Sequence, residues 1–546
     1  MTITPLAETS AAVKPAPAPA SSGHPALVAL FADWRAFNQP ALVKGIPDYS
    51  AAAMAAKAER LPEFKSRLAA FDTAGWTARD RGDWRLVQAE MNGLDFYMRV
   101  LRPWARDPGF YLTVFPDLSD VPAHEGTYAE PVVDLFAFAW PLSPADDARL
   151  ATQLETVAPL LEQARTNLAQ SDAHDLWAYG GQGFLDQANA LASLEQGKLA
   201  VRDLDGHRQA SIEGASPRLK RAVAQAREAS TSFAKWVSAE APKRTGPSGV
   251  GKEHYNWYLK HVLLSPYSFD DQKVILEREL ERSLASLRLE EVRNRRLPPA
   301  AEVSDPAAFG RLVERRTDQL YALLVDSGMI AERPYFRKAL EAQRFGYTAP
   351  ADRNFFSHVS ALDPGPLMTH FVHWIELARL KHEPLASPIR QVAPLFNIYA
   401  DRSEGYATAM EEIVMQAGYY DDVPRGREAV WIMLANRAAR GLASLRVQAN
   451  EIGLDEAGKF HAAWTPRGYS DPASPLVGFE QVLYLRQPGY GPSYIVGKAE
   501  IDRLLATASH RSELQGKPFS ARDFFAAYFA SGIVPHAIIQ DEMTAQ

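Results

Sequence analysis

Apolar residues recur every three to four positions along most of the chain, the spacing that places them on one face of an α-helix. Long helices are expected at residues 51–71, 83–100, 144–170, 184–199, 217–239, 270–296, 306–328 and 425–452. Residues 110–115, Phe-Tyr-Leu-Thr-Val-Phe, form a short and isolated strand candidate. Strands do not alternate with helices, and no repeat is evident. The pattern predicts one large, mainly α-helical domain with at most a small β element.

The first 25 residues depart from this pattern. They are rich in Ala, Pro, Ser and Thr, which is typical of a disordered tail. They have neither the basic start nor the apolar core of a signal peptide. We therefore expect a disordered tail over residues 1–25, a single helical domain over residues 26–540, and a cytoplasmic location.

The composition excludes several classes of function. The 546 residues carry a formal net charge of −7 and include no cysteine, which excludes disulfides, thiol nucleophiles and cysteine-bound metals. No basic run indicates nucleic-acid binding, and no apolar run reaches the length of a membrane span. A small-molecule substrate is expected, with no nucleic-acid or membrane partner. The sequence does not indicate an oligomeric state.

The candidate chemistry lies between residues 366 and 416. His370 and His373 are three residues apart on a predicted helix, so both are expected on one face. Glu404 and Glu411 are seven apart on the next predicted helix, about two turns along one stripe. Packed together, the two helices would place a histidine pair against two carboxylates.

Two His-Glu pairs, His124-Glu125 and His382-Glu383, carry part of the pattern of a zinc-binding helix. Neither pair has a second histidine four residues after the first. Both are therefore interpreted as surface features.

Three segments resemble the bacterial family catalogued as domain of unknown function 885, whose members resemble helical zinc metallopeptidases. They are Ser403–Glu411, Pro488–Lys498 and Gly251–Tyr255. The resemblance extends from the region of Trp34 to about Leu505. It implies a zincin-like helical scaffold and a metal-dependent peptidase activity.

The chain departs from the family's signature, which begins His-Glu and ends Pro-Gly-His-His. Here Phe371 follows His370, and the final histidine pair is absent. Phenylalanine cannot accept a proton, so ordinary peptide hydrolysis would require Glu376, Glu404 or Glu411 as the base. The cofactor is either zinc or another divalent metal, or none. The candidate metal ligands are His370, His373, Glu404 and Glu411.

Further polar and aromatic residues could complete a pocket. Arg486 could hold an anion and Tyr494 could donate a hydrogen bond, so both are candidate catalytic residues beside His370, His373 and Glu404. The candidate substrate-binding residues are His254, Tyr255, Trp257, Tyr484 and Tyr490. Lyase-type cleavage of a small, possibly aromatic substrate is the leading hypothesis, because it needs no activated water. A metal-dependent hydrolase with a rearranged base and a non-catalytic binding protein are the alternatives.

Overall fold

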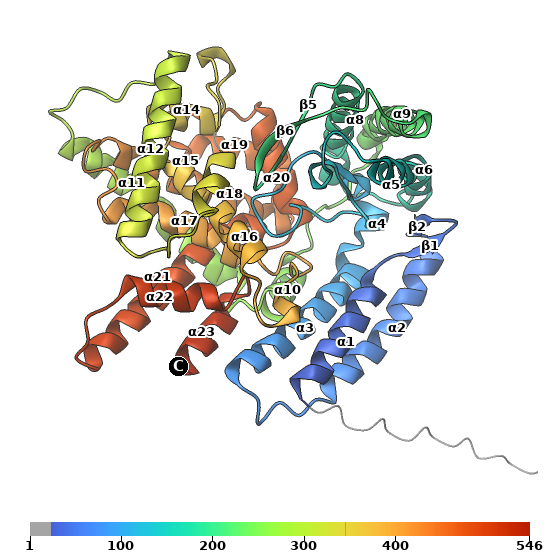
Figure 1. The fold of residues 1–546 in the computed structure, drawn as a ribbon, viewed down its shortest axis with the longest axis horizontal. Coiled ribbons are helices and arrows are strands. Elements are labelled where there is room, and N and C mark those ends of the chain that lie inside the picture. Colours follow the sequence, from blue (N-terminus) through green and yellow to red (C-terminus); the bar gives the residue numbers. More distant parts are fainter. Residues whose placement is uncertain (1–22, 344, 546) are drawn as a thin grey trace, which may run out of the picture.

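The computed structural model describes residues 23–343 and 345–545, and it is built almost entirely from helices (Figure 1). This confirms the predicted mainly α-helical fold. Most of the predicted tail, residues 1–25, lies outside the described residues, and α1 already begins at His24. Among the described residues, no helix is both long enough and apolar enough to cross a membrane.

The first part of the chain forms three helices and then a run of short elements. These elements are α1 (His24–Asn38), β1 (Ala41–Val43), β2 (Ile46–Asp48), α2 (Ala51–Ala69), α3 (Ala78–Phe96), the π-helix η1 (Tyr97–Leu101), α4 (Pro103–Arg106), η2 (Pro108–Tyr111), β3 (Val114–Phe115), β4 (Val133–Asp134) and η3 (Leu135–Ala137).

A second group of helices packs around its own apolar cluster, at the upper right of Figure 1. Its elements are α5 (Pro144–Leu154), α6 (Val157–Asn167), α7 (His174–Ala178), α8 (Gln182–Glu195), β5 (Leu199–Asp203), β6 (Gly206–Ala210), α9 (Pro217–Glu240) and η4 (Ala241–Lys243).

Most of the remaining elements contribute to the largest apolar cluster, together with α1, α2 and α3. They are α10 (Lys252–His261), α11 (Phe269–Arg293), α12 (Pro306–Asp326), α13 (Phe336–Ala342), η5 (Pro350–Asp352), α14 (Phe355–Leu362), α15 (Gly365–His370), α16 (Val372–His382), η6 (Pro388–Arg390), α17 (Ala400–Gln416), α18 (Gly426–Gln448), α19 (Leu454–Trp464), η7 (Pro466–Gly468), α20 (Pro475–Arg486), α21 (Tyr490–Leu514), α22 (Ala521–Ala530) and α23 (His536–Ala545).

The described strands form three two-stranded sheets, of which β1–β2 and β5–β6 are antiparallel and β3–β4 is parallel. The strand predicted at residues 110–115 was wrong in extent. Residues 108–111 form the short helix η2, and the strand is confined to Val114–Phe115. The helix predicted at residues 144–170 is broken into α5 and α6, since Pro159 would clash with the carbonyl of Glu155 in a continuous helix.

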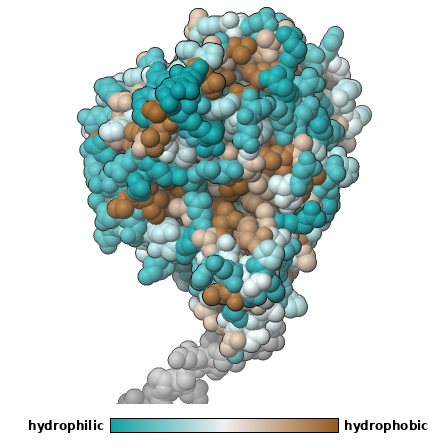
Figure 2. Space-filling model, turned by 90° about the vertical axis from the view of Figure 1, so that its left-hand side faces the viewer, coloured by the Kyte–Doolittle hydropathy of each residue, from teal (hydrophilic) through white to brown (hydrophobic). Residues whose placement is uncertain are grey.

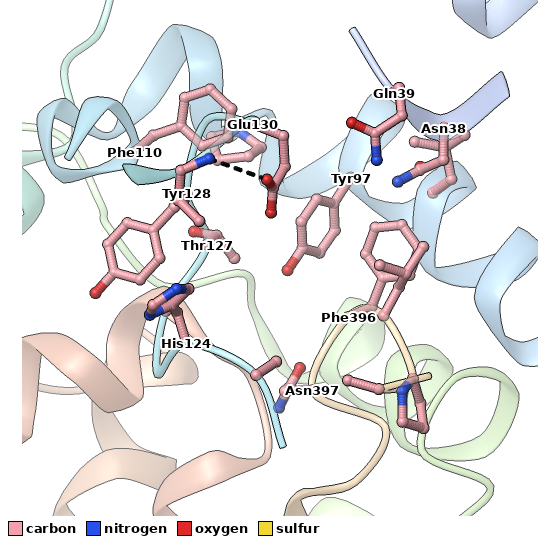
Figure 3. Close-up of a pocket in the computed structure, with 18 of the residues that line it drawn as sticks. Asn38, Gln39, Tyr97, Phe110, His124, Thr127, Tyr128, Glu130, Phe396 and Asn397 are labelled. Carbon is pink, nitrogen blue, oxygen red and sulfur yellow. Dashed lines mark hydrogen bonds between the residues drawn. The ribbon is translucent and has the colours of Figure 1, made fainter. Parts of the chain in front are cut away.

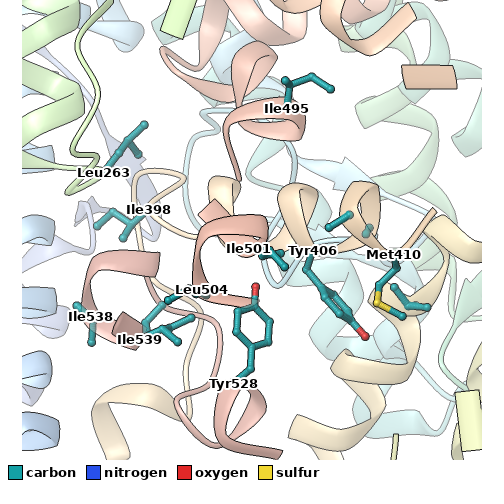
Figure 4. Packing of buried hydrophobic residues seen from close by; sticks show 14 of the residues in the cluster. Leu263, Ile398, Tyr406, Met410, Ile495, Ile501, Leu504, Tyr528, Ile538 and Ile539 are labelled. Carbon is teal, nitrogen blue, oxygen red and sulfur yellow. The ribbon is translucent and has the colours of Figure 1, made fainter. Parts of the chain in front are cut away.

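The helices α17, α18 and α21 form the centre of the larger cluster. Every residue of α17 from Ala400 to Glu411 is buried. Figure 4 shows part of this cluster, in which Tyr406 of α17 lies beside Ile501 of α21 and Leu504 lies beside Ile539 of α23. The face in Figure 2 is mainly hydrophilic with scattered apolar residues, as is usual for a folded protein.

Two glycines let α17 and α21 touch through their backbones. A Cβ atom on Gly405 would lie 2.4 Å from backbone atoms of Gly497, and one on Gly497 would lie 2.0 Å from the carbonyl oxygen of Asp401. Backbone atoms cannot move aside as flexible side chains do. This crossing therefore fixes how Glu404 on α17 faces Tyr490 and Tyr494 on α21.

We expect Gly405→Ala to lower the free energy of unfolding by about 1–3 kcal/mol, because the added methyl group overpacks this crossing. The matched control is Gly310→Ala in α12, where an added Cβ meets nothing within 4 Å. That change is expected to stabilise the helix by roughly 0.5–1 kcal/mol. Guanidinium unfolding measures both variants, and equal effects would contradict the role of the crossing.

Candidate metal and acid–base site

The two histidines lie on either side of a break between helices. The sequence predicted one helix through this region, but α15 ends at His370 and α16 begins at Val372. At the break, the amide of Phe371 donates to the carbonyl of Met368, and the amide of Trp374 donates to the carbonyl of Phe371. Each of these hydrogen bonds joins residues three apart, whereas the hydrogen bonds of an α-helix join residues four apart. The imidazoles are nonetheless adjacent, with ring centroids 4.9 Å apart.

The structure brings Glu404 of α17 to both imidazoles. Its Oε2 atom lies 3.4 Å from Nε2 of His370 and 3.4 Å from Nε2 of His373. All three side chains are buried, and one ligand atom from each lies within 4.8 Å of the other two. The other carboxylate oxygen, Oε1, accepts a hydrogen bond of 2.6 Å from the hydroxyl of Tyr490.

Glu411, the fourth predicted ligand, lies behind His370. Its Oε1 is 3.1 Å from Nδ1 of His370, the ring nitrogen that faces away from Glu404. Arg437 of α18 contacts the same carboxylate at 2.7 and 2.8 Å, and its Nη2 lies 3.0 Å from Nδ1 of His370. Arg437 therefore contacts both the imidazole of His370 and the carboxylate of Glu411, and it holds these two side chains together.

The charges in this cluster are strongly coupled. Burial would raise the pKa of Glu404, but contacts with His370 and His373 outweigh it and hold that pKa well below its usual range. Burial and the charge of Arg437 would lower the pKa of His370, but Glu404 and Glu411 outweigh them and raise it. The cluster is thus arranged to keep Glu404 ionised.

These residues fit a divalent cation. Neither Nε2 of His373 nor Oε2 of Glu404 makes a hydrogen bond of acceptable geometry with the described residues. Their separation of 3.4 Å is too long for a charge-assisted hydrogen bond. It matches the distance of roughly 3.4 Å between two ligands of a tetrahedral zinc ion with bonds of about 2.0–2.2 Å. Two histidines and one glutamate are a known catalytic zinc set, and Glu411 is the expected outer carboxylate.

Three tyrosines predicted at the site lie together beside this cluster. The ring of Tyr494 lies 6.1 Å from that of His370, and Tyr484 stacks near Tyr490 at 6.2 Å. Arg440 of α18 lies over Tyr494, 4.6 Å from its centroid, and is paired with the buried Glu480. Arg437 and Arg440 were not predicted. Two arginines three residues apart in the apolar run 429–445 were the available signal.

Glu125 was interpreted as a surface residue, and the structure corrects this. It is only partly accessible, and its Oε1 accepts a hydrogen bond of 3.1 Å from Ser119. Burial first, and then the charges of Glu404 and Asp120, raise its pKa to about 8. Glu125 therefore belongs to the electrostatic environment of Glu404, although it is distant in sequence.

Glu376, one of the carboxylates considered as a base, is fully engaged elsewhere. Arg402 donates to both of its oxygens at 3.0 and 2.5 Å, and Arg379 donates at 3.1 Å. Both Arg402 and Glu376 are buried. The structure thus gives Glu376 a structural ion pair and does not place it against the histidines.

Arg486 does not contact the histidines either. It pairs with Asp107 at 2.6 Å, donates to the carbonyl of Thr127 at 2.9 Å, and lies over the ring of Tyr128. These contacts fix the segment that carries Glu125. Arg486 therefore stabilises a segment next to the histidine cluster and does not contact the histidines themselves.

The structure does not bring the predicted cluster around residues 254–257 to the site. His254 is exposed. Tyr255 is buried in the core and donates to Gln272, while Trp257 stacks on Phe96. Their aromatic character reflects core packing at a distance from His370.

Comparisons with known proteins agree with the fold. A structure named "putative lipoprotein of unknown function", from Shewanella oneidensis, has a TM-score of 0.66 and 13% identity, and the match covers 96% of this chain and 100% of that one. A "putative lipoprotein" from Colwellia psychrerythraea has a TM-score of 0.62 and 14% identity, with 95% and 98% covered. At such identities the likeness shows the fold alone.

No protein of curated function is significantly similar to this chain. A family model does match, over residues 41–321, which is more than half of the sequence and lies before the His–Glu cluster. The chain belongs to the family described as "Bacterial protein of unknown function (DUF885)".

Proposed function

We propose that this protein is a metal-dependent enzyme, a hydrolase acting on a small molecule, with a divalent cation held by His370, His373 and Glu404. The observation that carries the proposal is the convergence of three buried side chains, in which Oε2 of Glu404 lies 3.4 Å from both Nε2 atoms and neither this oxygen nor Nε2 of His373 has an acceptable hydrogen bond. The resemblance to zincin-like metallopeptidases supports it. In this reading the chain is a divergent member that has replaced the His-Glu signature with another ligand set.

A divalent cation at such a site would act as a Lewis acid toward a substrate oxygen and make water a better nucleophile. The remaining chemistry falls to side chains. Tyr490 holds the second oxygen of Glu404, which leaves Oε2 directed at the imidazoles. Arg437, paired with Glu411, contacts Nδ1 of His370. Both contacts pre-organise the ligand set.

Glu125 is the proposed acid–base group. A carboxyl group with a pKa of about 8 can both accept a proton from water and return it to a leaving group near neutral pH. The hydroxyl of Tyr494 has no hydrogen-bond partner within the described part of the chain. Together with Arg440, which lies over the Tyr494 ring, it is a candidate donor to negative charge that develops on the substrate.

The lyase hypothesis was favoured because Phe371 removes the usual base. With Glu125 as the proposed base, the absence of a glutamate at position 371 does not favour a lyase over a hydrolase. We also propose that the protein is located in the cytoplasm and acts without a nucleic-acid or membrane partner.

A screen of zinc-loaded protein against ester, amide and peptide substrates in ¹⁸O-labelled water tests this function. We expect turnover that requires the metal, with the label in the product. Glu125→Gln should lower kcat by about 10²–10⁴ and leave the metal content unchanged. The matched control is Glu228→Gln, an exposed residue of α9, with unchanged kcat.

Each other outcome of the screen contradicts a named part of the proposal. Turnover without label would identify a lyase. Label incorporation that persists in Glu125→Gln would remove the acid–base role of Glu125. A metal-loaded protein without turnover on any substrate would favour a binding protein.

A further inference from the structure

A second site lies away from the histidine cluster. A cavity of about 520 Å³ opens between α3, the segment of residues 118–136 and the loop of residues 393–399 (Figure 3). None of His370, His373 and Glu404 lines it. Its volume is that of a site for a small organic molecule. Its walls include the rings of Tyr97, Phe110, Tyr128 and Phe396.

The backbone around this cavity adopts unusual conformations. Tyr97 begins the π-helix η1, a local widening of the helix that is frequent at functional sites. Phe396 and Asn397 are consecutive non-glycine residues in the left-handed region, with φ of 59° and 47°. The hydroxyl of Tyr258 holds this pair, at 2.5 Å from the carbonyl of Phe396 and 2.6 Å from Oδ1 of Asn397. Such conformations persist only when their surroundings enforce them.

These backbone conformations bring two aromatic side chains together in the cavity wall. The rings of Tyr97 and Phe396 meet edge to face, with centroids 4.6 Å apart. Figure 3 shows the carboxylate of Glu130 and the hydroxyl of Tyr97 directed into the space between the labelled side chains. The carboxylate and the ring faces that this edge-to-face contact leaves uncovered are therefore available to one ligand.

Most charges of the cavity wall are already compensated. Arg35 forms a double hydrogen bond with Glu90 at 2.6 and 3.0 Å, and His124 pairs with Asp134 at 2.8 Å. The ammonium of Lys57 donates to the carbonyls of Asn38 and Gln39, and burial lowers its pKa to about 8.

Glu130, an exposed residue, is the acidic group of the wall that lacks such a partner among the described residues. Its carboxylate accepts only a bond of 3.3 Å from the amide of Val132, and it has no ion pair within the described part of the chain. The cavity wall partly shields the carboxylate of Glu130 from water and so raises its pKa, although the nearby His124 opposes this shift. A positive ligand group would supply the missing counter-charge.

We propose that this cavity binds an organic cation, a primary or quaternary ammonium group on an aromatic or apolar body. The ammonium would lie against Glu130 and the faces of Tyr97 and Phe396, and the apolar body would pack on Phe110 and Tyr128. Aromatic faces attract cations through the ring quadrupole, and a carboxylate adds direct charge pairing. This proposal uses neither the metal nor its three ligands, so its test does not depend on the outcome of the metal proposal.

The test uses three probes of similar shape and different charge: the cation phenethylamine, the neutral alcohol 2-phenylethanol and the anion 3-phenylpropionate. A fourth probe, benzyltrimethylammonium, is a quaternary cation. Isothermal titration of the full chain should show the two cations binding at least about tenfold more tightly than the alcohol and the acid. Glu130→Gln should weaken cation binding at least about tenfold. The matched control, Glu162→Gln on α6, removes an exposed carboxylate and should change nothing.

Equal binding of cation, alcohol and acid would overturn the proposal, and so would the absence of cation binding up to about 10 mM. Unchanged cation binding in a folded Glu130→Gln variant would also overturn it. Should that variant fail to fold, the charge series on the unaltered protein decides. Phe396→Leu provides a second test, because loss of the ring should weaken the binding of benzyltrimethylammonium.

Discussion

Zinc affinity is expected to fall more than 100-fold when His370→Ala, His373→Ala or Glu404→Gln is introduced. Each change removes one of three atoms that converge from α15, α16 and α17. Loss of an outer-shell partner alone typically costs about 10–100-fold in metal affinity, so loss of a direct ligand should cost more. Competition titration against a chromogenic chelator measures the affinities.

A graded control accompanies these variants. Glu411→Gln should reduce affinity by about 10–100-fold, because Glu411 contacts His370 and Arg437 in the outer shell and is not itself a ligand. The exposed His510, changed to Ala, should leave affinity unchanged. Equal affinities across the three ligand variants and His510→Ala would show that zinc binds elsewhere.

The second large effect concerns stability. Arg402→Met is expected to lower the free energy of unfolding by about 3–5 kcal/mol, because it leaves the carboxylate of Glu376 buried without its main partner. Both side chains are almost fully buried, so water cannot replace the guanidinium. Guanidinium unfolding followed by circular dichroism measures the loss.

A double variant separates the cost of an unpaired charge from the loss of packing. Arg402→Met with Glu376→Leu should recover at least half of the lost stability, since replacing a buried pair by apolar groups is often tolerated. The exposed pair of Arg333 and Glu383 supplies the control, and Arg333→Met should cost less than about 1 kcal/mol. Similar losses for Arg333→Met and Arg402→Met would contradict this account of the buried pair.

The helical pattern of the sequence was sufficient to predict the fold class and most long helices, because buried faces impose a regular spacing of apolar residues. This pattern did not predict the helix break and the hairpin, which depend on single proline and glycine residues. Pro159 divides the helix predicted at residues 144–170. The hairpin β5–β6 was missed, although Asp205-Gly206 at its turn is a recognised hairpin signal.

The candidate site was predicted only in part, because the spacing of residues within a helix shows which side chains share one face but not which segments meet. Spacing within two helices pointed to His370, His373, Glu404 and Glu411, and the structure places these side chains together. Spacing could not reveal Glu125, because a loop more than 200 residues earlier brings it near Glu404. It also could not separate the tyrosines beside the cluster from Tyr255, since both sets are buried aromatic residues.

The central claim is that His370, His373 and Glu404 surround one divalent cation. The most direct test is X-ray diffraction from zinc-loaded crystals at the zinc absorption edge. We expect one anomalous peak about 2.0–2.2 Å from Nε2 of His370, Nε2 of His373 and an oxygen of Glu404. Ordered density for these three side chains with no anomalous peak between them would contradict it.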